Sequence, residues 1–148
     1  MGHTYSINNA HVVFHTGRRI IREAELMRLH AYIATLARDY RVRQVLVGGT
    51  VDHVHLVGDF PLEKAAADVM CAIKANSSRW LKGIHSCYAD FSWQQGYGYF
   101  AVSASIRPDV VHYIEHQAVH HLKESAAQEY ERMKLLHENA AYGEAYKV

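Results

Sequence analysis

The sequence has few residues that break or cross-link a chain. It contains only two prolines and nine glycines among 148 residues, which argues against a disordered linker. Its two cysteines, Cys71 and Cys87, form no CxxC pair, so a zinc ribbon or a thioredoxin-like redox motif is not expected. Two reduced thiols in an intracellular protein are the simpler interpretation.

Long hydrophobic runs are also missing. No apolar stretch approaches the roughly 20 residues that a bilayer-spanning helix needs, and no apolar segment of the signal-peptide type follows Met1. We therefore expect a soluble, cytoplasmic protein with no membrane partner. A GxxxxGK[ST] phosphate-binding loop is absent as well, which gives no indication of nucleotide hydrolysis.

The charge is nearly balanced, and histidine is abundant. A formal net charge of +1 is not typical of a general nucleic-acid coat, although it leaves room for a local basic groove. The chain contains 12 histidines, which gain positive charge below neutral pH. Its length suffices for one domain with a real core, and we predict a single domain over residues 1–148.

Hydrophobic periodicity predicts alternating strands and helices. We expect strands at 11–16, 41–50, 51–60 and 99–105 and helices at 23–40, 61–80, 109–123 and 126–138, with an aromatic and glycine-rich loop at 90–98. The order is β-α-β-β-α-β followed by helices. This order predicts an α+β fold of the ferredoxin-like, split βαβ type, in which an antiparallel sheet has helices on one face, plus C-terminal helices.

The stretch VDHVHLV at 51–57 contains two histidines two residues apart. In a strand, residues i and i+2 share a face, so His53 and His55 are expected side by side. Such a pair is a weak signal alone, because two core histidines with hydrogen-bond partners would look the same. Its meaning depends on the rest of the sequence.

A second polar group lies on the helix expected at 109–123. Its core stripe is expected to be Val111, Ile114, Ala118 and Leu122. Tyr113 and Gln117 are at i,i+4 and therefore neighbours. They form a flanking stripe with His120 and His121 that can meet the open face of the sheet.

Together these residues could serve phosphate chemistry. Two imidazoles and one amide oxygen make three neutral ligands for a divalent cation and leave positions for water or phosphate oxygens. A tyrosine hydroxyl one helical turn from a ligand could attack a phosphorus atom, although its reference pKa of about 10 requires assistance. The product would be a phosphotyrosine that conserves the energy of the phosphodiester.

VDHVHLV resembles the HUH motif, and YIEHQ with the following HH resembles a helix that carries one catalytic tyrosine and a glutamine ligand. IKANSSRW and FSWQQGYGYFAVS are similar to further blocks of the same group. The chain thus resembles the single-tyrosine HUH transposases over about residues 11–138. These small insertion-sequence enzymes, with relatives that act on repetitive palindromic elements, move DNA as single strands.

The resemblance implies specific roles. His53, His55 and Gln117 would bind Mg²⁺ or Mn²⁺, and Tyr113 would form a 5′-phosphotyrosine and release a 3′-OH. It also implies a homodimer with sheets joined edge to edge, single-stranded DNA with hairpin ends as substrate, and a tyrosine helix that can complete the site of the other subunit. DNA contacts are expected for Lys74, Arg79, His120 and His121.

Other interpretations stay open at this stage. A domesticated relative could cut chromosomal palindromes without moving itself. A non-catalytic single-stranded nucleic-acid-binding module would use aromatic residues on the sheet but has no use for His53, His55, Tyr113 and Gln117 together. A metal-dependent hydrolase would not need Tyr113. A zinc site along one helical face, at His112, His116 and His120, is a further possibility.

Overall fold

The computed structural model describes residues 2–139 and 141–147. The described strands are β1 (Asn9–His15), β2 (Arg43–Thr50), β3 (His53–Asp59) and β4 (Gly98–Ala101). The α-helices are α1 (Glu23–Asp39), α2 (Ala66–Ile84), α3 (Arg107–Glu115), α4 (Gln117–His120) and α5 (Ala126–Glu138), and two short 3-10 helices are η1 (Ser86–Tyr88) and η2 (Tyr142–Tyr146).

The strands form one antiparallel sheet in the order β2-β3-β1-β4. β3 is inserted between β1 and β2, which are joined through α1, so the expected split βαβ pattern is confirmed. β1 and β3 occupy the centre of the sheet and pair along their whole length, from Asn9 opposite Asp59 to His15 opposite His53. The histidine pair therefore lies on a strand with neighbours on both sides.

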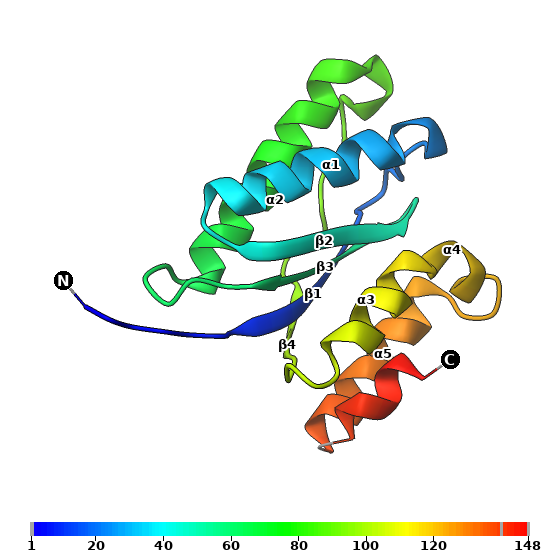
Figure 1. Ribbon diagram of the computed structural model, residues 1–148. Helices are drawn as coiled ribbons and strands as arrows, with labels where there is room; N and C mark the ends of the chain where they lie inside the picture. The colour runs from blue at the N-terminus through cyan, green and yellow to red at the C-terminus, as the bar shows by residue number, and fades with distance from the viewer. Residues whose placement is uncertain (1, 140, 148) are drawn as a thin grey trace.

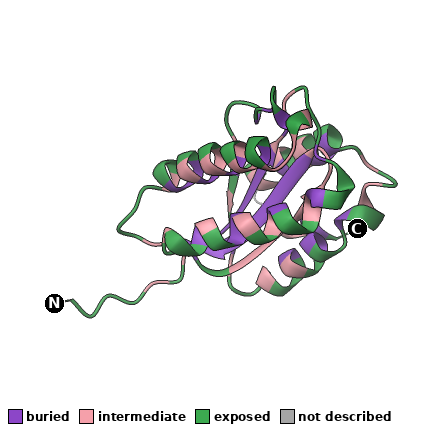
Figure 2. Cartoon of the chain, turned by 90° about the horizontal axis from the view of Figure 1, so that it is seen from above, coloured by how far each residue is buried: buried purple, intermediate pink, exposed green. Residues whose placement is uncertain are grey.

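One face of the sheet carries the larger apolar core. Figure 1 shows α1 and α2 side by side across this face. Because side chains alternate along a strand, Phe14, Val54 and Leu56 point toward these helices and are buried against Leu29 and Ile73. Figure 2 shows the consequence from above, with buried strands between helices whose outer surfaces are exposed.

The other face is covered by α3, α4, α5 and η2, as Figure 1 shows. Its apolar part is smaller and includes Val13, Val57, Ile114 and Met133. Gly48 allows α3 to approach β2 closely, because a Cβ atom at this position would lie 2.8 Å from the backbone oxygen of Ile114. This close packing places α3 over β2, next to β3, which carries the two histidines.

The helix expected to open at Pro61 begins later, so that prediction was wrong. α2 starts at Ala66, and Leu62, which lies within the range expected for the helix, is 60% exposed. The intervening residues run along the end of α1, where Glu63 pairs with Arg41 and the Lys64 ammonium lies over the Tyr40 ring. These contacts hold the segment as a loop.

The helix expected at 109–123 is divided. Of its expected core stripe, Ile114 is buried and Val111 is partly buried, whereas the prediction was wrong for Ala118 and Leu122. α3 ends at Glu115, and His116, with φ −112° and ψ 26°, separates it from α4. Leu122 is 83% exposed. The buried stripe is Val110, Tyr113, Ile114 and Gln117. Polar side chains occupy it because polar partners face them there.

None of the helices in the described residues has both the length and the apolar character needed to cross a membrane.

Candidate active site

The site begins with the two histidines of β3. His53 and His55 are fully buried and share the face that α3, α4 and α5 cover, as the strand periodicity predicted. Their ring centroids lie 4.9 Å apart. Two imidazoles fixed on a central strand can present two nitrogen atoms to a common point with little loss of rotamer entropy on binding.

Tyr113 and Gln117 reach the same place from α3 and the start of α4. Both side chains are buried, each with only 2% exposure. The Gln117 side-chain amide donates to the Tyr113 carbonyl at 3.2 Å, and its Oε1 atom lies 3.0 Å from His53 Nε2. The amide is thus oriented with its oxygen toward the imidazoles. These four predicted residues are brought together.

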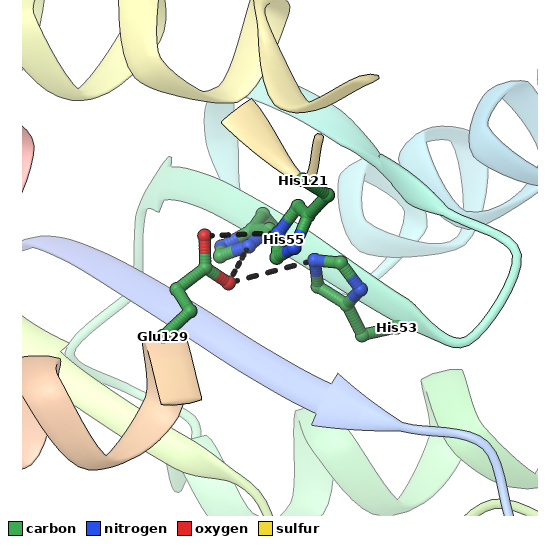
Figure 3. A group of neighbouring side chains, drawn as sticks. All are labelled: His53, His55, His121 and Glu129. Carbon is green, nitrogen blue, oxygen red and sulfur yellow. Dashed lines mark hydrogen bonds and ion pairs between the residues drawn. The ribbon is translucent and has the colours of Figure 1, made fainter. Parts of the chain in front are cut away.

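Glu129 of α5 completes the cluster and was not predicted from the sequence. Its fully buried carboxylate accepts a hydrogen bond from the Tyr113 hydroxyl and lies 2.8 Å from His55 Nε2. Figure 3 shows the carboxylate pointing from α5 toward the histidines. The signal in the sequence is an acidic residue within the apolar stripe of the last helix, between Ala126 and Met133.

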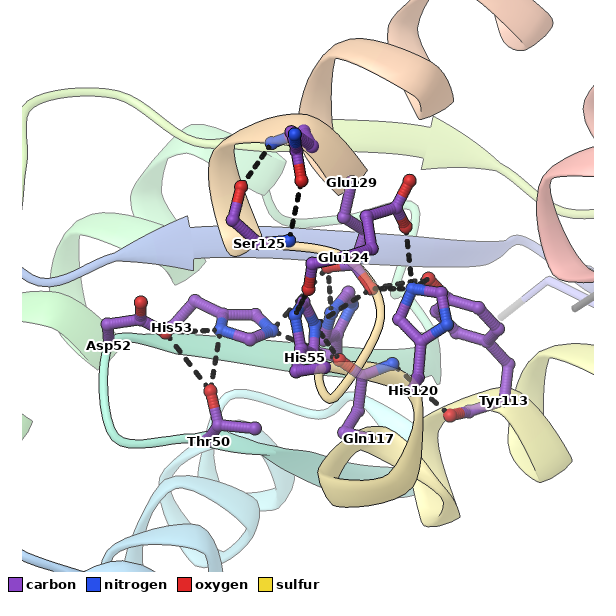
Figure 4. A network of polar contacts seen from close by, with 12 residues as sticks. Thr50, Asp52, His53, His55, Tyr113, Gln117, His120, Glu124, Ser125 and Glu129 are labelled. Carbon is purple, nitrogen blue, oxygen red and sulfur yellow. Dashed lines mark hydrogen bonds and ion pairs between the residues drawn. The ribbon is translucent and has the colours of Figure 1, made fainter.

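His120 and His121, expected as DNA contacts, also turn into this centre. His121 Nε2 lies 2.9 Å from Gln117 Oε1 and 3.2 Å from Glu129 Oε2. His120 Nε2 lies 3.0 Å from the Tyr113 hydroxyl and 2.6 Å from Glu124 Oε1. The two histidines therefore contact different parts of the cluster, as Figure 4 shows for His120.

Outer hydrogen bonds orient both histidines of β3. Asp52 Oδ1 lies 2.8 Å from His53 Nδ1. On the other side, His11 Nε2 lies 2.6 Å from His55 Nδ1, and the Tyr146 hydroxyl lies 2.7 Å from His11 Nδ1. Partners of this kind fix the tautomer and the ring orientation of metal-binding histidines. His11 and Tyr146 were not singled out from the sequence.

The geometry fits a divalent cation. Two ligand atoms at right angles, each about 2.1 Å from a cation, are about 3 Å apart. Glu129 oxygens lie 2.8 Å, 3.2 Å and 3.5 Å from the Nε2 atoms of His55, His121 and His53. The four residues offer ligand atoms within 4.8 Å of one another. A divalent metal could be held here with little rearrangement.

Electrostatics keep His55 and Glu129 in the forms that bind metal. Burial lowers the pKa of His55 to about 4, so its imidazole is neutral at neutral pH. Burial alone would raise the pKa of Glu129, but His55 and the hydrogen bonds from its neighbours hold it well below the usual range. Burial, together with the negative charge of Glu129, raises the pKa of Tyr113. The nucleophile candidate is therefore unactivated as it stands.

Lys74 and Arg79 lie elsewhere, on α2 over the opposite face of the sheet. The Lys74 ammonium donates to the carbonyls of Gln94 and Gly96, each at 2.7 Å, and Arg79 donates to Asn76 Oδ1 at 3.1 Å. DNA contact by these two residues stays a prediction. His112 and His116 of the possible zinc stripe are exposed, and His120 is turned toward Tyr113 instead.

Known structures share this fold. A chain from Deinococcus radiodurans R1 assigned as a transposase is 20% identical, with a TM-score of 0.59 over 79% of this chain and 96% of that one. The REP-associated tyrosine transposase bound to a REP hairpin is 16% identical, with a TM-score of 0.54 over 82% of this chain and 74% of that one. No curated protein matches the sequence.

The sequence itself matches a family model. Residues 4–117, from the segment before β1 to Gln117, match the family described as transposase IS200 like. That span includes the histidine pair, Tyr113 and Gln117, whereas Glu129 lies beyond it. On this match over most of its length, the chain belongs to the family of IS200-like transposases.

Proposed function

We propose that this transposase cleaves and rejoins single-stranded DNA through a 5′-phosphotyrosine formed on Tyr113. The observation that carries the proposal is the meeting of one tyrosine hydroxyl with His53, His55 and Gln117 around a buried carboxylate. A module that only bound nucleic acid would gain nothing from such a group, because burying polar and charged side chains costs free energy that their mutual hydrogen bonds only offset.

The reaction consists of two transesterifications. In the first, Tyr113 Oη forms a bond to the scissile phosphorus, the bond to the upstream 3′-oxygen breaks, and that oxygen takes a proton from solvent. The hydroxyl proton leaves along the hydrogen bond to Glu129 and passes on to solvent, because a carboxylate whose pKa is held so low does not retain it. In the second, the 3′-OH of another strand attacks the same phosphorus and loses its proton to solvent. The bond to Tyr113 then breaks, and Tyr113 Oη regains a proton from solvent by the same route.

His53, His55 and Gln117 would hold Mg²⁺ or Mn²⁺, with Glu129 and His121 as further ligands. When bound, the cation would polarise the scissile phosphate and offset its growing negative charge. Among the two ions, the imidazole-rich ligand set favours Mn²⁺, because Mg²⁺ prefers oxygen ligands. Asp52 and His11 would keep the two imidazoles of β3 in the ligating tautomer.

The proposed substrate is DNA whose hairpin ends flank the mobile segment, in line with the REP hairpin bound by one structural relative. Lys74 and Arg79 are proposed phosphate contacts outside the reacting centre, and His120 would contact DNA beside Tyr113. His121, also expected as a DNA contact, is assigned to the metal instead, because its Nε2 atom faces Gln117 and Glu129 and its Nδ1 atom faces the Glu124 carbonyl. We further propose a homodimer, for which β2, at one end of the order of described strands, offers its outer edge for pairing.

Tyr113 is buried, so the DNA needs a path to it. A pocket of about 120 Å³, lined by His112, Tyr113, His116, Val119, His120, Lys123 and Tyr146, reaches the tyrosine ring from the surface. Its volume is too small for a nucleotide. The proposal therefore requires exposed side chains at the rim of this pocket, such as Val119 and Lys123, to turn aside when DNA binds.

Covalent capture tests the proposal. Protein and Mn²⁺ are mixed with 3′-labelled or 5′-labelled single-stranded oligonucleotides that carry a hairpin from the DNA flanking the gene. We expect a denaturation-resistant adduct that retains the 3′ label, with release of the 5′-labelled fragment. Tyr113→Phe and His53→Ala should abolish the adduct, whereas Tyr99→Phe, a change at a partly exposed tyrosine of β4, should not.

The alternatives give different results. Tight binding of the flanking DNA without any adduct would indicate a binding module. Cleavage that persists in Tyr113→Phe would indicate a hydrolase without a covalent step. The assay does not separate a mobile enzyme from a domesticated relative, which differ in the DNA on which they act.

A further inference from the structure

Arg132 lies beside the atom that would react. Its Nη2 atom donates a hydrogen bond to the Tyr113 hydroxyl at 2.9 Å, and its guanidinium carbon lies 5.9 Å from the centre of the tyrosine ring. Arg132 belongs to α5 and follows Glu129 by three residues, so one helical turn presents both side chains to the same hydroxyl. This segment lies beyond the residues that match the family.

The guanidinium is held in place by groups other than the tyrosine. Its Nε atom donates to Glu124 Oε2 at 3.0 Å, and its Nη1 atom donates to the Ala145 carbonyl at 2.5 Å. The Arg132 side chain is 24% exposed and that of Glu124 is 19% exposed. The third nitrogen, Nη2, donates both to Glu124 Oε1 at 3.0 Å and to the Tyr113 hydroxyl, so the donor to Tyr113 is in place before any substrate arrives.

This arrangement is suited to stabilising a developing charge. Arginine stays protonated and presents its donors in a rigid plane. A donor fixed near the site of charge development lowers the barrier without reorganisation during the reaction. The neutral hydroxyl needs no such cation, because Glu129 already accepts its hydrogen bond. The cation becomes useful when Tyr113 Oη carries negative charge.

We propose that Arg132 is a catalytic residue that stabilises the negative charge on Tyr113 Oη in both transesterifications. The inference rests on the proposed function, since it requires Tyr113 to be the nucleophile. During cleavage, Arg132 would stabilise the oxygen as it loses its proton and bonds to phosphorus. During rejoining, it would stabilise the same oxygen as the leaving group, when the bond to phosphorus breaks and its electron pair remains on oxygen.

A structural role is the competing explanation, because Arg132 also joins Glu124 to η2. The two explanations differ in how they depend on the acidity of the phenol. If Arg132 stabilises charge on the oxygen, a fluorinated tyrosine, whose phenolate is intrinsically more stable, should need it less. If Arg132 only maintains the fold, its loss should cost the same with either phenol.

The experiment measures single-turnover adduct formation and strand rejoining with Mn²⁺ and hairpin oligonucleotides from the flanking DNA. We expect Arg132→Gln to slow both steps by about 100-fold, the usual effect of removing one such donor, while oligonucleotide binding is retained. Arg132→Lys, which keeps the charge, should recover part of the rate. Lys134→Gln, at a partly exposed residue of the same helix, is the control and should match the wild type.

The decisive comparison repeats Arg132→Gln in protein with 3,5-difluorotyrosine at position 113. The rate loss should shrink to about 10-fold. An equal loss with both phenols, or wild-type rates in Arg132→Gln, would overturn the proposal while leaving the covalent mechanism intact. Absence of any adduct in the wild-type protein would overturn the proposed function and this inference with it. Thermal melting of each variant identifies any that fail to fold, in which case Arg132→Lys carries the comparison.

Discussion

At the scale of single residues, the centre contains buried polar groups that are almost all satisfied by one another. Glu129 is the common partner, since its two oxygens contact His55, His121 and Tyr113. A carboxylate in such surroundings is stable only while these partners remain. Removing one of them is therefore expected to disturb the whole cluster and to have non-additive effects.

His30 of α1 is a histidine without such support, and it supplies a prediction about pH. Its Nε2 atom is buried without a partner among the described residues. Burial, followed by the charge of His53, lowers its pKa from 6.5 to about 4. Since the unfolded chain binds this proton more readily, the stability that depends on neutral His30 is complete above about pH 6.5 and is lost as the pH falls toward 4.

We therefore expect the free energy of unfolding of His30→Leu to gain about 1–2 kcal/mol on that of the wild type when the pH is lowered from 8 to 5. Leucine suits the position because Leu46 and Val47 line the same pocket. Urea denaturation at the two pH values measures the effect. Parallel pH dependence in the two proteins would contradict the assigned shift.

Residue-level prediction from the sequence succeeded where the spacing was local. His53 with His55 and Tyr113 with Gln117 are pairs at i,i+2 and i,i+4, so strand and helix geometry alone brings each pair together. Glu129 and His11 could not be assigned in this way. They reach His55 from 74 and 44 residues away in the sequence, and only the packing of α5 and β1 determines those contacts.

At the scale of elements, α5 contributes residues to the site although it lies outside residues 4–117, which match the family. It holds Glu129 and Arg132, and its first turn is closed by a capping box. Ser125 Oγ accepts from the Gln128 amide at 3.1 Å, and Gln128 Oε1 accepts from the Ser125 amide at 2.9 Å. The sequence analysis placed the start of this helix at 126, and Ser125 just before it is a preferred cap residue, which is a local signal.

Loss of that cap tests how much the capping box stabilises the protein through α5. We expect Ser125→Ala to lower the free energy of unfolding by about 1 kcal/mol, because the amide of Gln128 loses its acceptor. Ser125→Asp keeps an acceptor at the same point and should stay close to the wild type. Chemical denaturation of the three proteins provides the measurement. Equal stability of Ser125→Ala and the wild type would show that the cap contributes nothing.

The elements that were misplaced in the sequence analysis share a physical cause. Proline at 61 and the apolar Leu62 are compatible with a helix start, but contacts of Glu63 and Lys64 with α1 favour a loop. Likewise, the apolar residues Val111 and Leu122 suggested the core side of one long helix. Buried partners for Tyr113 and Gln117 rotate the helix so that polar side chains face inward. In both cases tertiary contacts override local pattern.

At the scale of the whole molecule, the sheet separates an apolar core from a polar centre. The face under α1 and α2 is an apolar core, and the face under α3 and α5 carries the polar centre, as Figures 1 and 4 show. The strand order could be predicted because the β-α-β-β-α-β pattern permits few arrangements. Coverage of the second face by three helices of the same chain could not, since it depends on how α5 folds back over α3.

That coverage leads to a prediction about subunits. His53, His55, Tyr113 and Gln117 meet within one chain and are buried there. A mixture of Tyr113→Phe and His53→Ala chains, unfolded and refolded together, should therefore form no adduct beyond that of each variant alone. If α3 and α4 instead completed the site of the other subunit, mixed dimers would contain one intact pair of histidines with one intact tyrosine. Covalent capture on hairpin DNA would then show restored activity.

Wild-type chains refolded with either variant serve as the control, because they must retain activity in proportion to their share. Restoration in the mixture of the two variants would show that the arrangement within one chain is not the one that reacts.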